Sequence, residues 1–169
     1  MRTMFRFSIL LLASLAIASA QLKVAIINVQ SAILDTAEIK KAQGELEARY
    51  KPRQQQVEKL QKDLADLQAQ VQAGQGKLTP QAEQNLQATG QRKQRELQRL
   101  GEDLQADVDR DRNDILQKSG ARMTDVVKKL AEERGFDMVV DVTNTIYYKP
   151  ALEITKDATV AYDKAYPVK

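Results

Sequence analysis

Three short stretches of the sequence contain residue types that could bind a phosphate or a metal ion. The first is GQGKLT, Gly74 to Thr79, in which a lysine follows two glycines. A phosphate-binding loop needs four residues between its glycines and a hydroxyl residue directly after the lysine. Here one residue separates Gly74 from Gly76, and Leu78 stands between the lysine and Thr79. The stretch therefore predicts a tight turn and no nucleotide site.

The second stretch, DVDRDRND, places Asp107, Asp109 and Asp111 at the spacing of a calcium-binding loop. Such a loop also needs glycine at its sixth position and glutamate at its twelfth, where this sequence has Arg112 and Lys118. We interpret the stretch as a solvated helix face with ion pairs. The chain has no cysteine and no histidine, which removes thiolate ligands and the commonest general base. We predict no catalytic, cofactor or metal site and no enzymatic activity.

The third stretch, QRKQRELQR, is basic but contains no aromatic residue. Sites that bind single-stranded nucleic acid normally stack bases on aromatic side chains, so no nucleic-acid partner is expected. The bland interpretation is a charged helix surface. The functional interpretation is contact with an unfolded client or an anionic surface through Lys77, Arg92, Lys93, Arg95 and Arg99.

The first twenty residues have the pattern of a secretory signal peptide. Arg2 and Arg6 precede an apolar run, Phe7 to Ile17, and the small residues ASA follow it. The run is too short to cross a bilayer, which takes about 20 residues. We predict export and cleavage near Ala20–Gln21. The mature chain then has 149 residues, a one-domain length, with 24 basic and 23 acidic side chains.

From about Ser31 the spacing of apolar residues becomes helical. Steps of three, four and seven residues are typical of a narrow coiled-coil seam. Pro52 lies inside this pattern and predicts a kink, because proline removes one backbone hydrogen bond. The seam residues are Ile39, Leu46, Tyr50, Val57, Leu60, Leu64, Leu67 and Val71.

A second helix follows a break at residues 74–79. Thr79 is a good N-cap, Pro80 suits the first helical position and Gly135 is a natural C-terminal cap. Residues 31–135 therefore predict an antiparallel helical hairpin with its turn near 74–79. An arm of forty or more residues would reach roughly 60 Å.

The segments on either side of the hairpin predict a small sheet. Leu22 to Asn28 is short and β-branched, Phe136 to Val142 alternates, and Thr145 to Tyr148 follows a turn at Asn144. We predict an α+β fold, mostly α, with a three-stranded sheet per chain and the hairpin inserted between strands one and two. A short last helix, capped by Thr155 and containing Val160, Ala161 and Ala165, would lie over the sheet.

Residues 22–30 and 136–169 form the predicted base. Domains of about 40 residues usually need disulfides, metals or oligomerisation, and disulfides are impossible here. We therefore predict an oligomer with a shared apolar core. The alternative is that the hairpin packs back onto the sheet of its own chain, but its length and narrow seam argue against this. The predicted shared core is Val24, Ile26, Val139, Val140, Val142, Ile146 and Tyr148.

The order of these segments resembles the Skp/OmpH family of periplasmic chaperones. The likeness rests on KVAIINVQSAI near the mature start, on the long helical insertion, and on GFDMVVDVTNTIYYKPALEIT before a short last helix. Its most specific element is Met138 to Tyr148. The resemblance implies a homotrimer whose strands form a central barrel and whose hairpins surround a cavity. It also implies an ATP-independent holdase for unfolded outer-membrane proteins, located in the periplasm.

The charge of the chain departs from this family, whose members are often strongly basic. The mature chain is nearly neutral, but residues 67–99 carry a net charge of +3 and residues 100–135 a net charge of −2. Two other functions stay open at this point. One is a structural coiled-coil spacer of the cell envelope, and the other is a module that binds anionic lipid or lipopolysaccharide through the basic part of the arm.

Overall fold

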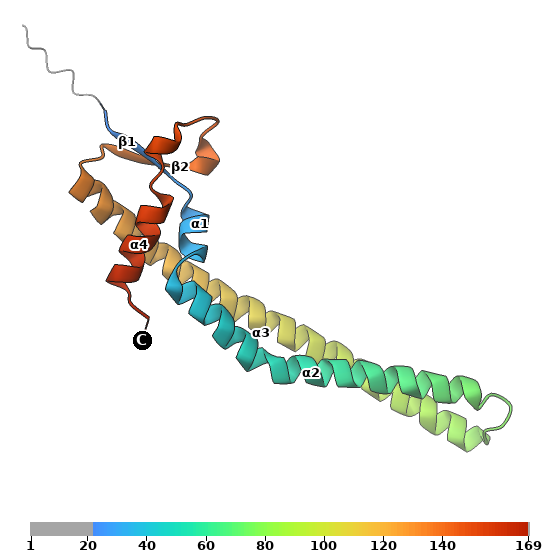
Figure 1. Cartoon of the computed structure of the whole chain (residues 1–169). Coiled ribbons are helices and arrows are strands. Elements are labelled where there is room, and N and C mark those ends of the chain that lie inside the picture. Colours follow the sequence, from blue (N-terminus) through green and yellow to red (C-terminus); the bar gives the residue numbers. More distant parts are fainter. Residues whose placement is uncertain (1–21, 169) are drawn as a thin grey trace, which may run out of the picture.

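The computed structural model describes residues 22–168, in which a small base carries a long helical arm (Figure 1). The predicted signal peptide, residues 1–20, and the cleavage point near Ala20–Gln21 lie outside the described residues. Within the described part, no helix combines the length and the apolar character that crossing a bilayer requires.

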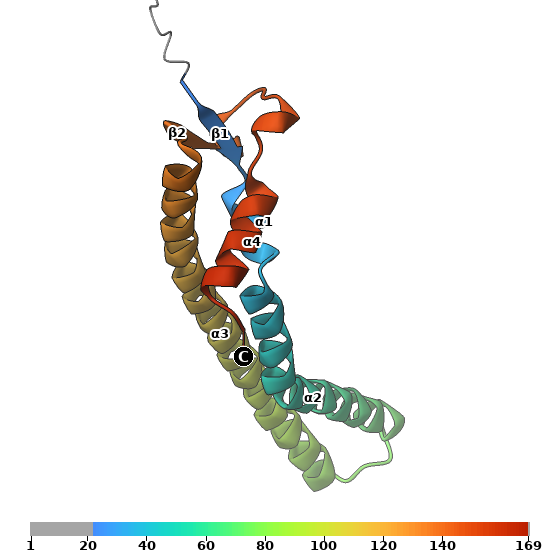
Figure 2. The ribbon, with the colours of Figure 1, turned by 60° about the vertical axis from the view of Figure 1, so that its left-hand side comes forward.

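The arm consists of two antiparallel helices, α2 (Ala37–Ala73) and α3 (Pro80–Arg134). Apolar residues of the predicted seam are buried between them, with Tyr50, Leu60 and Leu64 each less than a tenth exposed. Figure 2 shows that α2 changes direction in its middle, in the part that contains Pro52. The structure thus has the predicted hairpin, and the bend lies where proline interrupts the backbone ladder.

Local capping signals end the arm helices as predicted. The Thr79 side chain accepts a hydrogen bond from the Ala82 amide at 3.3 Å, and Pro80 occupies the first helical position. Gly135 ends α3 in the left-handed conformation with a φ of 66°, which glycine adopts without steric cost. The turn between the helices runs from Gly74 to Thr79.

The first helix of the chain differs from the prediction. Instead of one helix from about Ser31, a short α1 (Val29–Leu34) ends before Thr36, and α2 begins at Ala37. Thr36 is fully buried, and its hydroxyl oxygen accepts the Ile39 amide at 3.3 Å. The helix restarts there because a threonine side chain satisfies a free amide of the new first turn.

The sheet has two strands, β1 (Val24–Ile27) and β2 (Met138–Asp141), which pair in parallel. The predicted pairing of the two chain ends is therefore right, but the three-stranded sheet is wrong for the described residues. Thr145 to Tyr148 is not a strand, and a short 3₁₀ turn (Val142–Asn144) follows β2 directly. Asp141 causes this turn, because its carboxylate accepts from the Thr143 amide and hydroxyl at 2.8 and 2.6 Å.

One face of the sheet is covered by helices of the same chain. Ala25 and Ile27 of β1 share a buried cluster with Met123, Val126 and Leu130 of α3. The expectation that the hairpin leaves its own sheet uncovered is therefore wrong for the last turns of α3. These turns carry apolar residues at steps of three and four, which aligns a buried stripe with the sheet. The rest of the arm extends away from the base (Figure 1).

The last helix, α4 (Thr155–Ala165), packs against α1 and α3. Ala158 and Tyr162 are its fully buried residues, whereas Val160 is exposed. The prediction that Thr155 caps this helix is wrong, because no side chain caps its first turn. The Thr155 hydroxyl instead accepts the Asn28 amide at 2.9 Å, which joins the start of α4 to the end of β1. A 3₁₀ turn at Pro150–Leu152 precedes the helix.

Candidate functional site

The base exposes several large apolar side chains to solvent. Ile146 and Tyr147 are 108% and 79% exposed, and Met138 and Leu152 are 50% and 39% exposed. In the parallel register Met138 lies opposite Val24 on the sheet. Large apolar side chains that the single chain leaves exposed are candidates for an interaction surface.

The residues predicted for a shared core occupy different environments in the single chain. Ile26 is 4% exposed, and Val139 packs against the chain's own buried cluster. Ile146 is fully exposed, and the other four, Val24, Val140, Val142 and Tyr148, are half-buried. The shared core stays a prediction. Sequence reasoning did not single out Met138 or Tyr147, although strand alternation places Met138 on the same face as Val140.

A partly buried polar joint connects α4 to the start of the arm. Glu38 of α2 accepts from Arg122 of α3 at 2.7 Å through one carboxylate oxygen, and the Tyr162 hydroxyl donates to the other. Burial, and then the hydrogen bond to Glu38, raise the pKa of the Tyr162 hydroxyl. The Arg122 guanidinium also lies over the Tyr166 ring, 4.6 Å from its centroid. The joint links α2, α3 and α4 where the arm meets the base.

Asp107 and Asp111 of α3 accept hydrogen bonds from side chains in the bent part of α2. Asp107 accepts from Arg53 and Arg110, each at 2.6 Å, and these hydrogen bonds lower the pKa of its carboxyl group. Asp111 accepts from the Tyr50 hydroxyl at 2.7 Å and from Arg49 at 2.8 Å. The interpretation of DVDRDRND as an ion-paired helix face is confirmed. Across residues 22–168, no three potential metal ligands of the carboxylate, thiolate or imidazole type converge.

The basic residues predicted for the arm tip are spread along the distal part of the hairpin. Lys77 lies in the turn, and the other four lie further along α3. Lys93 pairs with Asp63 across the arm at 2.7 Å, and Arg99 pairs with Asp103 along α3 at 3.2 Å. Arg92 donates to Thr89 at 3.4 Å. Arg95 is exposed and has no acidic partner in the described part of the chain.

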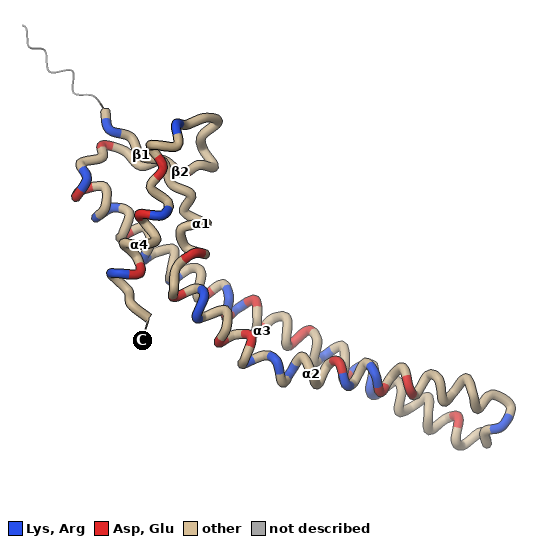
Figure 3. The backbone as a smooth tube through the Cα atoms, viewed as in Figure 1, with Lys and Arg blue, Asp and Glu red and all other residues tan. Residues whose placement is uncertain are grey.

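The end of the arm is nearly free of charge. Lys77 and Glu83 are the charged residues between positions 67 and 91, and the far part of the tube in Figure 3 is correspondingly almost uncoloured. The surface there is dominated by glutamine. The tip therefore combines polar, uncharged side chains with the half-exposed part of the apolar seam.

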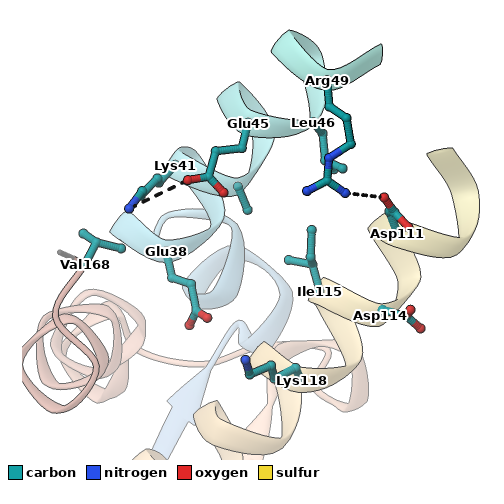
Figure 4. Close-up of a pocket in the computed structure, with 11 residues that line it drawn as sticks. Glu38, Lys41, Glu45, Leu46, Arg49, Asp111, Asp114, Ile115, Lys118 and Val168 are labelled. Carbon is teal, nitrogen blue, oxygen red and sulfur yellow. Dashed lines mark hydrogen bonds and ion pairs between the residues drawn. The ribbon is translucent and has the colours of Figure 1, made fainter. Parts of the chain in front are cut away.

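A cleft of about 460 Å³ lies between the two arm helices close to the base (Figure 4). Leu46 and Ile115 face each other inside it, and charged residues surround them. Lys41 pairs with Glu45 at 3.7 Å and Arg49 pairs with Asp111 at 2.8 Å. The lining holds three basic and four acidic residues, so the cleft concentrates little net charge toward a ligand.

The family model described as outer membrane protein (OmpH-like) matches residues 23–161 of the chain. The chain belongs to the OmpH-like family. This OmpH-like chain is also 23% identical to a Skp-like protein of Pseudomonas aeruginosa, strain PAO1, over 92% of its own length and 94% of that relative. A crystal structure of an OmpH-like protein from Caulobacter crescentus CB15 has the same fold. The TM-score is 0.71 at 17% identity, and 89% of each chain is covered.

Proposed function

We propose that the exported chain is an ATP-independent periplasmic holdase, which binds unfolded outer-membrane proteins and prevents their aggregation. The observation that carries this proposal is the long, thin arm, which extends from the base into solvent and ends in a weakly charged tip (Figures 1 and 3). Membership of the OmpH-like family supports the same role.

We further propose that the working unit is a homotrimer assembled through the base. Met138, Ile146 and Tyr147 are the exposed apolar residues that such an assembly would cover. Three arms held by one base would surround a shared space. Contacts that are weak individually would then sum, because a client held by one arm meets the other two at a high effective concentration.

The proposal is tested by diluting an unfolded outer-membrane barrel protein out of urea, with and without the mature chain and without ATP. We expect the chain to suppress the rise in light scattering when trimer and client are equimolar. A coiled-coil protein of similar size, unrelated in sequence, is the control for non-specific crowding. If the client aggregates equally fast in all samples, the holdase proposal is wrong, and the structural coiled-coil spacer becomes the favoured hypothesis.

Contact with an anionic surface is a second candidate, favoured by Arg92 and Arg95, neither of which has an acidic partner within residues 22–168. Binding to vesicles of anionic lipid or to lipopolysaccharide should weaken as salt rises, because exposed charges are screened. It should also be lost when Arg92, Lys93, Arg95 and Arg99 are all replaced by glutamine. Binding that survives this replacement removes the candidate.

A further inference from the structure

An apolar groove of about 620 Å³ lies between α2 and α3 near the tip of the arm. Its apolar lining comes from Leu64, Leu67, Val71 and Leu86, of which Leu64 is buried and the others are half-buried. Gly90 of α3 faces Leu67 across the groove, and a Cβ at Gly90 would lie 3.0 Å from the Leu67 Cδ2 atom. Gly90 and Leu67 are therefore already in close contact on the groove lining, and a larger residue at position 90 would have to move Leu67 or project into the groove.

Glutamine side chains form both rims of this groove. Gln68 and Gln72 line it from α2, and Gln87, Gln91 and Gln94 line it from α3. Each amide offers both donors and acceptors without charge. Residues four apart on a helix rise by roughly 6 Å, which is close to the roughly 6.7 Å repeat of every second residue in an extended chain. The rims therefore match the backbone spacing of an extended peptide.

Arg95 adds one positive charge at the edge of the groove. No carboxylate lines the groove, and Arg95 has no acidic partner among residues 22–168. Glu96 is its neighbour in sequence, but adjacent helix residues do not face each other. A free guanidinium beside an apolar surface is complementary to a carboxylate, which it can bind through two parallel hydrogen bonds.

We propose that this tip groove binds an extended segment of an unfolded client that carries a large apolar side chain next to a carboxylate. The apolar side chain rests on the surface that Leu67, Val71 and Leu86 form, the glutamines hydrogen-bond to the client backbone, and Arg95 pairs with the carboxylate. A helical segment fits less well, because its backbone groups are already paired with each other. A lipid chain also fits less well, because it offers the glutamines no donor or acceptor. The proposal rests on the holdase function and names its first point of contact.

The test uses the full mature chain and a short, disordered, fluorescent peptide in which leucine alternates with serine around one aspartate. Gly90→Leu fills the groove and should weaken peptide binding, measured by fluorescence anisotropy, by about tenfold or more, since it removes the burial of one leucine side chain. Gly101→Leu is the matched control. It makes the same change in the same helix, where no atom lies within 4 Å of an added Cβ. Equal binding by the two variants would overturn the proposal.

Arg95→Gln tests the carboxylate contact without filling the groove. We expect it to weaken binding of the aspartate peptide severalfold and to leave binding of the matching lysine peptide unchanged. Arg92→Gln, which removes a charge outside the groove lining, is its control. If Arg95→Gln weakens the binding of both peptides equally, the groove binds no client carboxylate. The same conclusion follows if anionic vesicles displace the peptide from the wild type but not from Gly90→Leu. The second result would assign it to lipid instead.

The outcome of this test is separate from that of the holdase proposal. If the wild type fails to suppress client aggregation, the proposed function fails, whatever the peptide does. If the wild type and Gly90→Leu suppress aggregation equally well and bind the peptide equally well, the holdase function stands and the groove assignment fails. Helix content and thermal unfolding of each variant show that the arm is intact in every comparison.

Discussion

Replacing Tyr162 with phenylalanine should loosen the joint between α4 and the arm. The ring is fully buried, and its hydroxyl donates to Glu38, whose other oxygen accepts from Arg122. A hydrogen bond to a charged group contributes about 1.5–3 kcal/mol to stability. Since the Glu38 side chain is 23% exposed and keeps its bond to Arg122, water can replace part of the lost interaction. We expect the free energy of unfolding to fall by about 1.5 kcal/mol, the lower end of that range.

The same hydroxyl makes stability depend on pH in a predictable direction. Burial and the bond to Glu38 raise the pKa of Tyr162 above its ordinary value of 10.0. Above pH 10 the unfolded chain therefore loses this proton before the folded chain does. The contribution is complete below about pH 10 and is lost as pH rises further. Tyr162→Phe should lose less stability over that rise, although Tyr50 and Tyr148, whose pKa values are also raised, keep part of the dependence.

The assay is urea unfolding followed by circular dichroism, at equal protein concentration because assembly changes apparent stability. Tyr166→Phe is the matched control. Its ring centroid lies 5.1 Å from that of Tyr162, and its hydroxyl makes no hydrogen bond within the described residues. The reasoning is refuted if both variants lose the same stability, or if Tyr162→Phe differs from the wild type by less than about 0.5 kcal/mol.

Three further predictions follow from the packing. Met123→Ala should lower the free energy of unfolding by about 2–5 kcal/mol, because Met123 is fully buried in the base, and a loss below about 1 kcal/mol in urea unfolding contradicts this. Asp107→Asn should speed trypsin cleavage near the bend, and Asp109→Asn should not. In urea unfolding, the free energy of unfolding of the wild type should also fall as pH falls below about 4. The lowered folded pKa of Asp107 favours the folded state only above the unfolded pKa. Ile146→Asp should yield monomers of unchanged helix content; an unchanged mass by light scattering would refute the role of the base.

The elements that sequence predicts well are those whose causes are local. Thr79, Pro80 and Gly135 act on their own helix ends, so their roles follow from neighbouring residues. The break at Thr36 has a distant cause in addition to the threonine cap. The Ala37 amide, the first of the new helix, donates to Asp163 of α4 at 2.9 Å. No spacing in the sequence signals that two residues so far apart meet.

The candidate site was predictable only in part, for the same reason. Basic residues in the arm are evident from the sequence, but which of them have partners depends on the register of α2 against α3. That register pairs Lys93 with Asp63 and leaves Arg95 unpaired in the described chain. In the sequence, Gly90 indicates only a position that lowers the stability of its helix. Across the hairpin it lies in close contact with Leu67 and forms part of the groove lining.

The parallel pairing of β1 and β2 sets an order of events in folding. Lys23 and Asp137, which are 114 residues apart, are joined by a hydrogen bond at the edge of the sheet, so the sheet closes a loop that contains the whole arm. Contacts near the turn of the arm span far fewer residues and cost less entropy to close. We therefore expect the hairpin to form first, starting at its tip. The pairing of β1 with β2 should follow later, because β2 lies beyond the arm in the sequence.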